Sequence, residues 1–280
     1  MNRNSQDVAP ERETLLIPVV VTGFGAITAR GDFSGANAQS LHQSTLDGTQ
    51  HTNFAIDDFE LSRYLSSPKT YLDRCSALAL GACALALRDA GIEYPVEASD
   101  ADRFGITLGT HLGCLETMRG FLDKAVERGV RMANPLLFSH SYVNSPISLC
   151  AIEYGLKGYH ATLCAGANSG LEATRAAHDA IALGHVDAML CGGVEAVSPT
   201  RSACAPDDAN GEAGVFFVLE SAERARERGA KVLCALKQEV FESASSLDSR
   251  SLFGACGGAQ SALQLAIVVA QEAQNQMIRD

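Results

Sequence analysis

The stretch YHATLCAGANSGLEATRAAHDAIALGHVDAMLCGGVEA (residues 159–196) contains three structural patterns in succession. Residues 159–165 form a short extended run. Residues 169–184 have the spacing of an amphipathic helix that ends at Gly184, and residues 186–197 are a second apolar run. A strand, a helix and a strand in this order are typical of α/β proteins. The stretch therefore predicts an α/β fold, and it raises the question of whether Cys164, at the first turn, is a nucleophile.

The same alternation continues on both sides of this stretch. Four further segments read as strands because they are apolar and β-branched: 17–28, 103–113, 214–221 and 231–241. Five segments have helical spacing: 73–91, 114–129, 144–155, 222–228 and 258–276. The connections 198–213 and 242–254 are rich in Ser, Asp and Gly. Alternation of this kind predicts a layered α/β fold with a largely parallel sheet.

The bulk composition excludes several classes of protein. The chain has 280 residues, of which 46% are hydrophobic, and its net charge is −11. Such acidity disfavours a nucleic-acid partner and an anionic membrane surface. The longest apolar run, residues 75–87, is too short to cross a bilayer, and the polar residues 1–14 contain no apolar signal core. We therefore expect a cytoplasmic protein with no membrane partner.

The cysteines and histidines indicate neither a metal site nor a disulfide framework. Nine Cys occur without any C-x-x-C pair, and seven His occur without H-x-x-x-H spacing. The glycines of GFGAIT (23–28) lack the context of a dinucleotide-binding turn. The sequence predicts no metal and no other cofactor.

Three segments together resemble the β-ketoacyl synthase family of the thiolase fold: VVVTGFGAIT (19–28), residues 154–196, and GEAGVFFVLESAERARERGAKVLCAL (211–236). The resemblance implies a layered thiolase-like fold, α/β/α/β/α, whose C-terminal half is severely shortened here. It also implies three regions. These are a polar tail (1–14), a ketosynthase-like half (15–241) and a remnant of the C-terminal half that is mainly one helix (242–280).

The resemblance implies that Cys164 is not the nucleophile. Members of this family carry a cysteine at a sharp strand-to-helix turn, where the helix N-terminus lowers its pKa. When positions are counted from Gly155-Leu-Lys-Gly158 on one side and from Ser169-Gly170 on the other, Ala167 falls at the nucleophile position. Cys164 lies three residues earlier, within the expected strand, and we interpret it as a small strand residue.

The histidines that the family uses for decarboxylation are also missing. The chain has no His after residue 241. Residues 250–270 resemble the last histidine motif of the family, and Ser251 stands where that His belongs. The block that precedes this motif in the family is too long to fit within residues 242–250. Without a thiolate or imidazoles, no acyl-enzyme and no condensation are expected.

What remains is the role of a partner subunit. Family members are dimers in which the strand before the nucleophile pairs across the two-fold axis, and residues of one subunit line the acyl channel of the other. The resemblance therefore implies a chain-length factor that forms a heterodimer with an active β-ketoacyl synthase. The truncated chain most resembles the small subunit of aryl polyene polyketide systems. The expected interface and channel residues are His160 and Thr162 on the strand, with His111, Leu112, Leu136, Leu137 and Phe138.

Several alternatives stay open at this point. Cys164 could serve an acyl-transfer or thioester-hydrolysing enzyme, and a malonyl decarboxylase is conceivable, although the missing imidazoles argue against it. The leucines and histidines named above also fit ordinary packing, and Asn168 fits a helix cap. Acyl carrier proteins are acidic, so we expect one to dock on the partner. The basic helix 223–231 is interpreted as a solvated face with Glu–Arg pairs.

Overall fold

A computed structural model describes residues 16–37, 40–41, 54–204 and 209–279. Its centre is one seven-stranded sheet of order β2-β1-β6-β5-β3-β4, in which β7 also pairs with β1. The strands are β1 (Val19–Thr28), β2 (Gly31–Ser34), β3 (Phe104–Gly109), β4 (His160–Leu163), β5 (Ala188–Glu195), β6 (Ala213–Ser221) and β7 (Cys234–Ala235).

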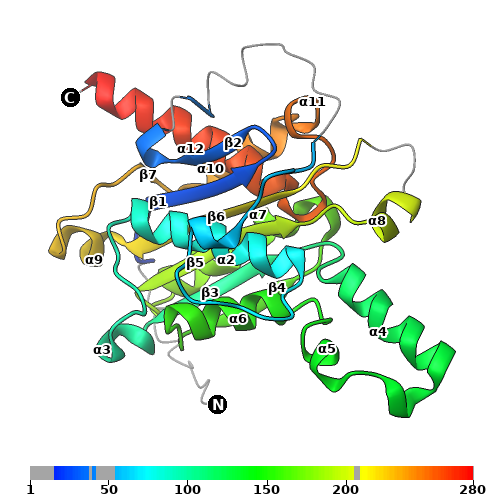
Figure 1. Cartoon of the computed structure of the whole chain (residues 1–280). Helices are drawn as coiled ribbons and strands as arrows, with labels where there is room; N and C mark the ends of the chain where they lie inside the picture. The colour runs from blue at the N-terminus through cyan, green and yellow to red at the C-terminus, as the bar shows by residue number, and fades with distance from the viewer. Residues whose placement is uncertain (1–15, 38–39, 42–53, 205–208, 280) are drawn as a thin grey trace, which may run out of the picture.

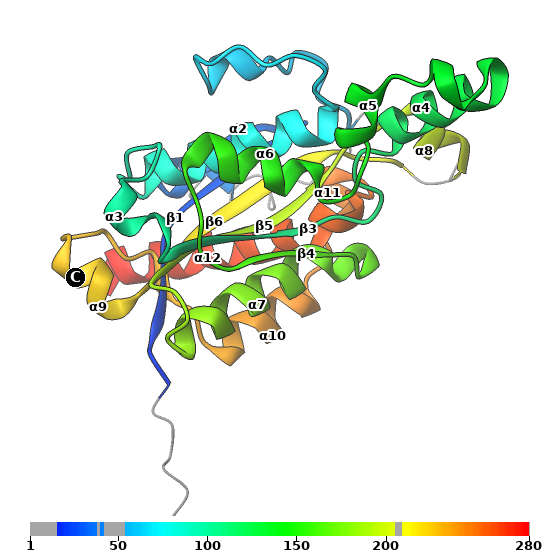
Figure 2. The same cartoon turned by 90° about the horizontal axis from the view of Figure 1, so that it is seen from below.

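Helices cover both faces of this sheet. Figure 2 shows α2 and α6 on one face and α7, α10 and α12 on the other. The helices are α2 (Arg74–Asp89), α3 (Ala98–Ala101), α4 (Leu115–Arg128), α5 (Pro135–Ser139), α6 (Ser145–Tyr154), α7 (Ser169–Ala182), α8 (Pro199–Cys204), α9 (Ala222–Glu227), α10 (Gln238–Ser246), α11 (Arg250–Phe253) and α12 (Gln260–Arg279). The described residues also form five short 3-10 turns: η1 (Gly35–Asn37), η2 (Leu61–Arg63), η3 (Val130–Met132), η4 (Gly166–Asn168) and η5 (Gly257–Ala259).

The sheet is mixed, which differs from the largely parallel sheet that the alternation predicts. Only β3 pairs in parallel, with β4 and with β5. Strand β6 is antiparallel to both of its neighbours, β1 and β5. The connection from β5 to β6 contains only the short helix α8 and no crossover helix against the sheet, so β6 returns beside β5 in the opposite direction.

Both faces of the sheet are buried in apolar cores. In β6, Phe217 and Leu219 belong to the core on the α7 side, while Phe216 and Val218 belong to the core on the α2 side. Successive side chains of a strand point to opposite faces, so a strand covered twice is apolar at every position. This explains why β6 reads as a continuous apolar run.

The prediction of a strand over residues 231–241 is wrong for most of that range. Only Cys234–Ala235 is a strand, and α10 begins at Gln238. Phe241 and Ala244 are buried while Glu242 and Ser243 are exposed, which is the spacing of a helix with one covered face. The two expected connections also contain helices: α8 lies in the first, while α11 and the end of α10 lie in the second.

Of the five layers that the resemblance implies, the described residues form three, with a single sheet. The tail 1–14 lies outside the described residues, and the expected boundary at residues 241 and 242 falls inside α10. Within the described ranges, no helix combines the length and hydropathy that crossing a bilayer requires.

Candidate functional site

The turn between β4 and α7 is the position at which the resemblance puts the nucleophile. Strand β4 ends at Leu163, the turn η4 follows, and α7 begins at Ser169. Ala167 lies within η4 and is exposed. The Ser169 hydroxyl accepts a hydrogen bond from the Ala165 amide at 2.8 Å and donates to the Gly166 carbonyl at 2.7 Å. Asn168 occupies the N-cap position, but its side chain makes no capping bond, contrary to the expected role.

Glycines allow three backbone segments to meet around this turn. A Cβ on Gly109, at the end of β3, would lie 2.2 Å from the carbonyl carbon of Ser169. A Cβ on Gly258, in η5, would lie 2.4 Å from the Cα of Thr110. Real Cβ atoms do not approach this closely, so these glycines permit contacts that no other residue would. The end of β3, the start of α7 and η5 therefore converge on one point.

The side chain of Glu195 links two of these segments through hydrogen bonds. Its side chain is 1% exposed, and its Oε2 accepts hydrogen bonds from the amides of His111 and Gly258, each at 2.8 Å. Its Oε1 accepts from the Leu112 amide at 3.2 Å. A carboxylate that receives several amide hydrogen bonds is well satisfied without a cationic partner. Glu195 thus joins the loop after β3 to η5.

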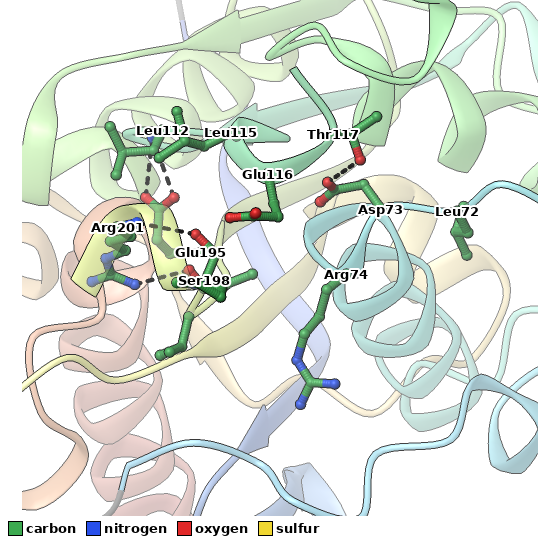
Figure 3. Close-up of a pocket in the computed structure, with 14 residues that line it drawn as sticks. Leu72, Asp73, Arg74, Leu112, Leu115, Glu116, Thr117, Glu195, Ser198 and Arg201 are labelled. Carbon is green, nitrogen blue, oxygen red and sulfur yellow. Dashed lines mark hydrogen bonds between the residues drawn. The ribbon is translucent and has the colours of Figure 1, made fainter. Parts of the chain in front are cut away.

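A cavity of about 310 Å³ lies beside Glu195. Figure 3 shows Glu195 and Arg201 on one side of it and Asp73 with Thr117 on the other. Its apolar lining is supplied by Leu72, Leu112, Leu115, Ala196, Val197 and Pro199. A concave space with an apolar wall and a few fixed polar groups is the usual form of a small-molecule site.

Two buried charged groups hold the walls of this cavity. Glu212 is 1% exposed and binds Arg74 at 2.6 Å, while it also accepts hydrogen bonds from the amides of Ile56 and Val197. The Arg201 guanidinium, in contrast, donates only to backbone carbonyls, those of Ala196, Gly211 and Ala255. Sequence reasoning missed Glu212, Arg74 and Arg201. The signal available for Glu212 was an acidic residue directly before an apolar strand.

The structure brings only part of the expected channel residues together. Leu112 lines the cavity, and the adjacent His111 side chain is exposed while its amide binds Glu195. Leu136, Leu137 and Phe138 lie apart from it on α5. They belong to a projecting segment, residues 115–143, which we call the arm and which Figures 1 and 2 show extending from one end of the molecule. Leu136 is 53% exposed and Phe138 is 44% exposed.

The arm is held by a small aromatic cluster. The Phe138 ring lies 5.4 Å from Phe121 and 4.9 Å from Tyr142, measured between centroids. Helix α4 contains no buried residue. His140, at the end of α5, has a buried Nδ1 for which the described residues provide no hydrogen-bond partner. The arm is therefore an element with a large exposed apolar surface and few contacts to the body.

The exposed thiol of Cys164 has none of the features of an activated nucleophile. It lies directly after β4, and partial burial raises its pKa, with a further rise from the charge of Glu195. In the part of the chain that the structure describes, no hydrogen bond links it to an imidazole. The nearby strand residue His160 is exposed and bonds through Nδ1 to the Gly158 carbonyl at 2.8 Å, and Thr162 is half-buried.

The last expected position is Ser251, where the resemblance places an imidazole. Ser251 is exposed on α11, six residues before η5. Across the described ranges, no three His, Cys, Asp or Glu side chains gather as a metal site requires. The arrangement offers a cavity and a tightly built turn, but it presents Ala167 and Ser251 where the resemblance implies reactive groups.

A comparison with protein families supplies the identity of this fold. Residues 36–210 match the family model described as "Beta-ketoacyl synthase, N-terminal domain". The chain belongs to the beta-ketoacyl synthase family. This agrees with the resemblance stated from the sequence.

Curated relatives agree with this family. The chain is 28% identical over 251 residues to the 3-oxoacyl-[acyl-carrier-protein] synthase 2 of Vibrio cholerae. This alignment covers 76% of this chain and 60% of the relative. It is 31% identical over 261 residues to a polyketide beta-ketoacyl synthase of Streptomyces halstedii, covering 78% of this chain and 61% of the relative. The chain thus spans about three fifths of the length of these relatives.

Solved structures share the fold over most of their own length. The ishigamide ketosynthase/chain length factor matches with a TM-score of 0.72 at 21% identity, covering 89% of this chain and 84% of that chain. A ketosynthase of a type II polyketide synthase, solved with its acyl carrier protein, matches with a TM-score of 0.77 at 18% identity and covers 93% of both chains. Chains of similar length therefore adopt this fold.

Proposed function

We propose that this chain is a ketosynthase-like subunit without condensing activity of its own. It pairs with an active β-ketoacyl synthase, stabilises that partner and shapes its acyl channel during polyketide or fatty-acid-like elongation. In this role it acts as a chain-length factor. The family membership and the similarity to a ketosynthase/chain length factor support the proposal.

The observation that carries the proposal is the methyl group of Ala167 at the start of α7. A thiolate at a helix N-terminus would be stabilised by the unpaired amides and by the helix dipole. Alanine offers no atom that could attack a thioester. Cys164 is a poor substitute, because its pKa is raised rather than lowered. Ser251, where an imidazole is expected, removes the second requirement.

Two neighbouring features suit the docking of a partner. Strand β4 is the last strand of the sheet and has a neighbour, β3, on one side only, so its other edge can pair with a strand from another subunit. The arm adds exposed apolar side chains, among them Val126, 85% exposed, and Val130, 81% exposed. Leu136 and Phe138 on the same arm would be the residues that reach the partner's acyl channel.

The charges of the chain favour carrier-protein docking on the partner. The basic helix α9 does not present a free basic surface, because Arg224 and Arg228 both bind the buried carboxylate of Glu220. Arg224 also binds Asp100 at 2.8 Å. The solvated face expected from the sequence is therefore wrong for these two arginines. An acidic carrier protein would find few free cations here.

Within this class, we propose the small subunit of an aryl polyene type II system. The support is the alanine at the nucleophile position, together with the similarity of the fold to the ishigamide ketosynthase/chain length factor. Such a partner would elongate a conjugated carboxylic acid bound to its carrier protein. This assignment is tested by the product that the assembled pair releases.

The test is co-expression with an active β-ketoacyl synthase that retains its cysteine and two histidines. A stoichiometric complex that elongates malonyl units, and loses this activity only when the partner's cysteine is replaced, is expected. Cys164→Ser should leave activity unchanged. The proposal would be refuted if the two proteins purified separately, without associating, and each were active in elongation on its own. An acyl adduct on Cys164 by intact mass would instead revive an acyl-transfer role.

A further inference from the structure

Helix α12 packs against one face of the sheet, and over residues 265–270 it is buried on all sides. Residues 265–270 are all buried, whereas a helix at the surface exposes one face. The sheet covers the inner side of α12 and α7 lies beside it. A third element must therefore cover the outer side, where the resemblance implies a second sheet.

Helix α10 is that element. Phe241, 3% exposed, and Ala244, fully buried, belong to the same apolar core as α7 and α12. The guanidinium of Arg175, on α7, lies 4.4 Å from the centre of the Phe241 ring, and the His178 ring meets it edge-on at 5.9 Å. One short helix thus bridges both α7 and α12 through a single aromatic anchor.

Helix α10 covers only a narrow part of the face formed by α7 and α12. A cleft of about 170 Å³, lined by Arg175, His178, Asp179, Gln238 and Phe241, lies on the α7 side of α10. A cleft of about 270 Å³ lies on its other side, between α10, β7 and α12. Two clefts flanking a nine-residue helix indicate that α10 acts as a strap across the face and does not form a complete layer.

We propose that α10 is a built-in strap that closes the α7–α12 face, so that association is confined to the opposite side of the chain. Among the residues that the structure describes, ten of the fifteen exposed large hydrophobic residues lie within residues 122–159, and none lies on α10 or on the described side chains of α12. The occupant of the 122–159 surface is the ketosynthase partner, an assignment that rests on the proposed function. The role of α10 does not depend on it.

The test compares two charges placed two residues apart on α10 of the full chain. Phe241→Asp is expected to raise the fluorescence of bound ANS about threefold or more and to cause self-association by light scattering, because it exposes the α7–α12 face. Ser243→Asp, on the exposed side of α10, is expected to change neither. Unchanged ANS binding and mass for Phe241→Asp would overturn the proposal.

Two further measurements separate the strap from general unfolding and from the proposed function. Hydrogen exchange should remain slow in β1 and β6 of Phe241→Asp while α12 loses protection. If Phe241→Asp unfolds, Phe241→Ala replaces it in the same measurements. A smaller rise in ANS fluorescence is then expected, and the absence of any rise would overturn the proposal that α10 is a strap. All of these measurements use the isolated chain. A failure to bind a ketosynthase would therefore refute the proposed function without affecting the result on α10.

Discussion

The carboxylate of Glu195 accepts a hydrogen bond from the amide of Gly258 at 2.8 Å across 63 residues of sequence. The same oxygen accepts the amide of His111 at the same distance. One buried acceptor therefore fixes the loop after β3 against η5, in front of the turn that begins α7.

Glu195→Gln should destabilise the chain by about 1–3 kcal/mol, because the amide nitrogen of Gln cannot accept and would face a backbone N–H. Urea unfolding followed by circular dichroism measures this loss. Glu97→Gln is the matched control, since Glu97 is exposed and its side chain makes no cap bond. Equal stability of both variants would show that the three amide contacts of Glu195 are not important for the fold.

The fold was largely predictable because its local signals are strong. Gly155, which ends α6 in a left-handed conformation, and Asp73, which caps α2, both mark boundaries that the sequence indicates. The direction of β6 was not predictable, since apolar patterning does not distinguish a parallel strand from an antiparallel one. Residues 238–241 were misassigned because they follow directly on a strand-like run, and tertiary packing of Phe241 decides their state.

The site was predictable only where position in the chain determines it. Ala167 was found by counting from glycines on both sides. Arg74, Glu212 and Arg201 were not found, because each makes its contacts across more than one segment and has no periodic pattern. Buried polar contacts of this kind become visible only once the segments that carry them are placed in the fold.

Glu220→Gln should be among the most destabilising single substitutions in the chain. The carboxylate is fully buried and binds Arg224, Arg228 and the Thr22 hydroxyl. Its loss removes the counter-charge of the Arg228 guanidinium and leaves Arg224 with Asp100 alone. Removal of one partner from a buried network costs about 3–5 kcal/mol. Chemical denaturation is the measurement, and Glu223→Gln, whose side chain is 74% exposed, is the control with little expected effect. A comparable loss in both variants would contradict the burial argument.

Ala167→Cys should create a thiol that is more reactive than Cys164. The start of α7 lowers the pKa of a thiol at position 167, whereas the pKa of Cys164 is raised above its ordinary value. At pH 7 the new thiol is therefore expected to be alkylated about tenfold faster. Iodoacetamide labelling from pH 6 to 10 measures both rates, in a Cys204→Ser background because Cys204 is also exposed.

The expected profiles differ in pH as well as in rate. Labelling of Cys164 should remain slow at neutral pH and rise only in the alkaline range, because a raised pKa keeps the thiol protonated. Labelling at position 167 should rise at lower pH. Condensing activity should not appear in the lone Ala167→Cys chain, since no imidazole replaces Ser251. Coincident profiles would mean that the start of α7 does not favour a thiolate.

Val130→Asp should weaken pairing with a ketosynthase while leaving the chain itself stable. Val130 is 81% exposed on the arm, so a charge there costs the isolated fold little, but it must be dehydrated if a partner covers the arm. We expect at least about a tenfold weaker complex, which corresponds to about 1.4 kcal/mol, measured by calorimetry or by co-purification yield. Leu183→Asp is the matched control, because Leu183 is 54% exposed and follows the end of α7, outside the arm. If the Leu183 variant loses the partner and the Val130 variant keeps it, then the arm is not the docking surface and the pairing must use the side of the molecule that carries α7.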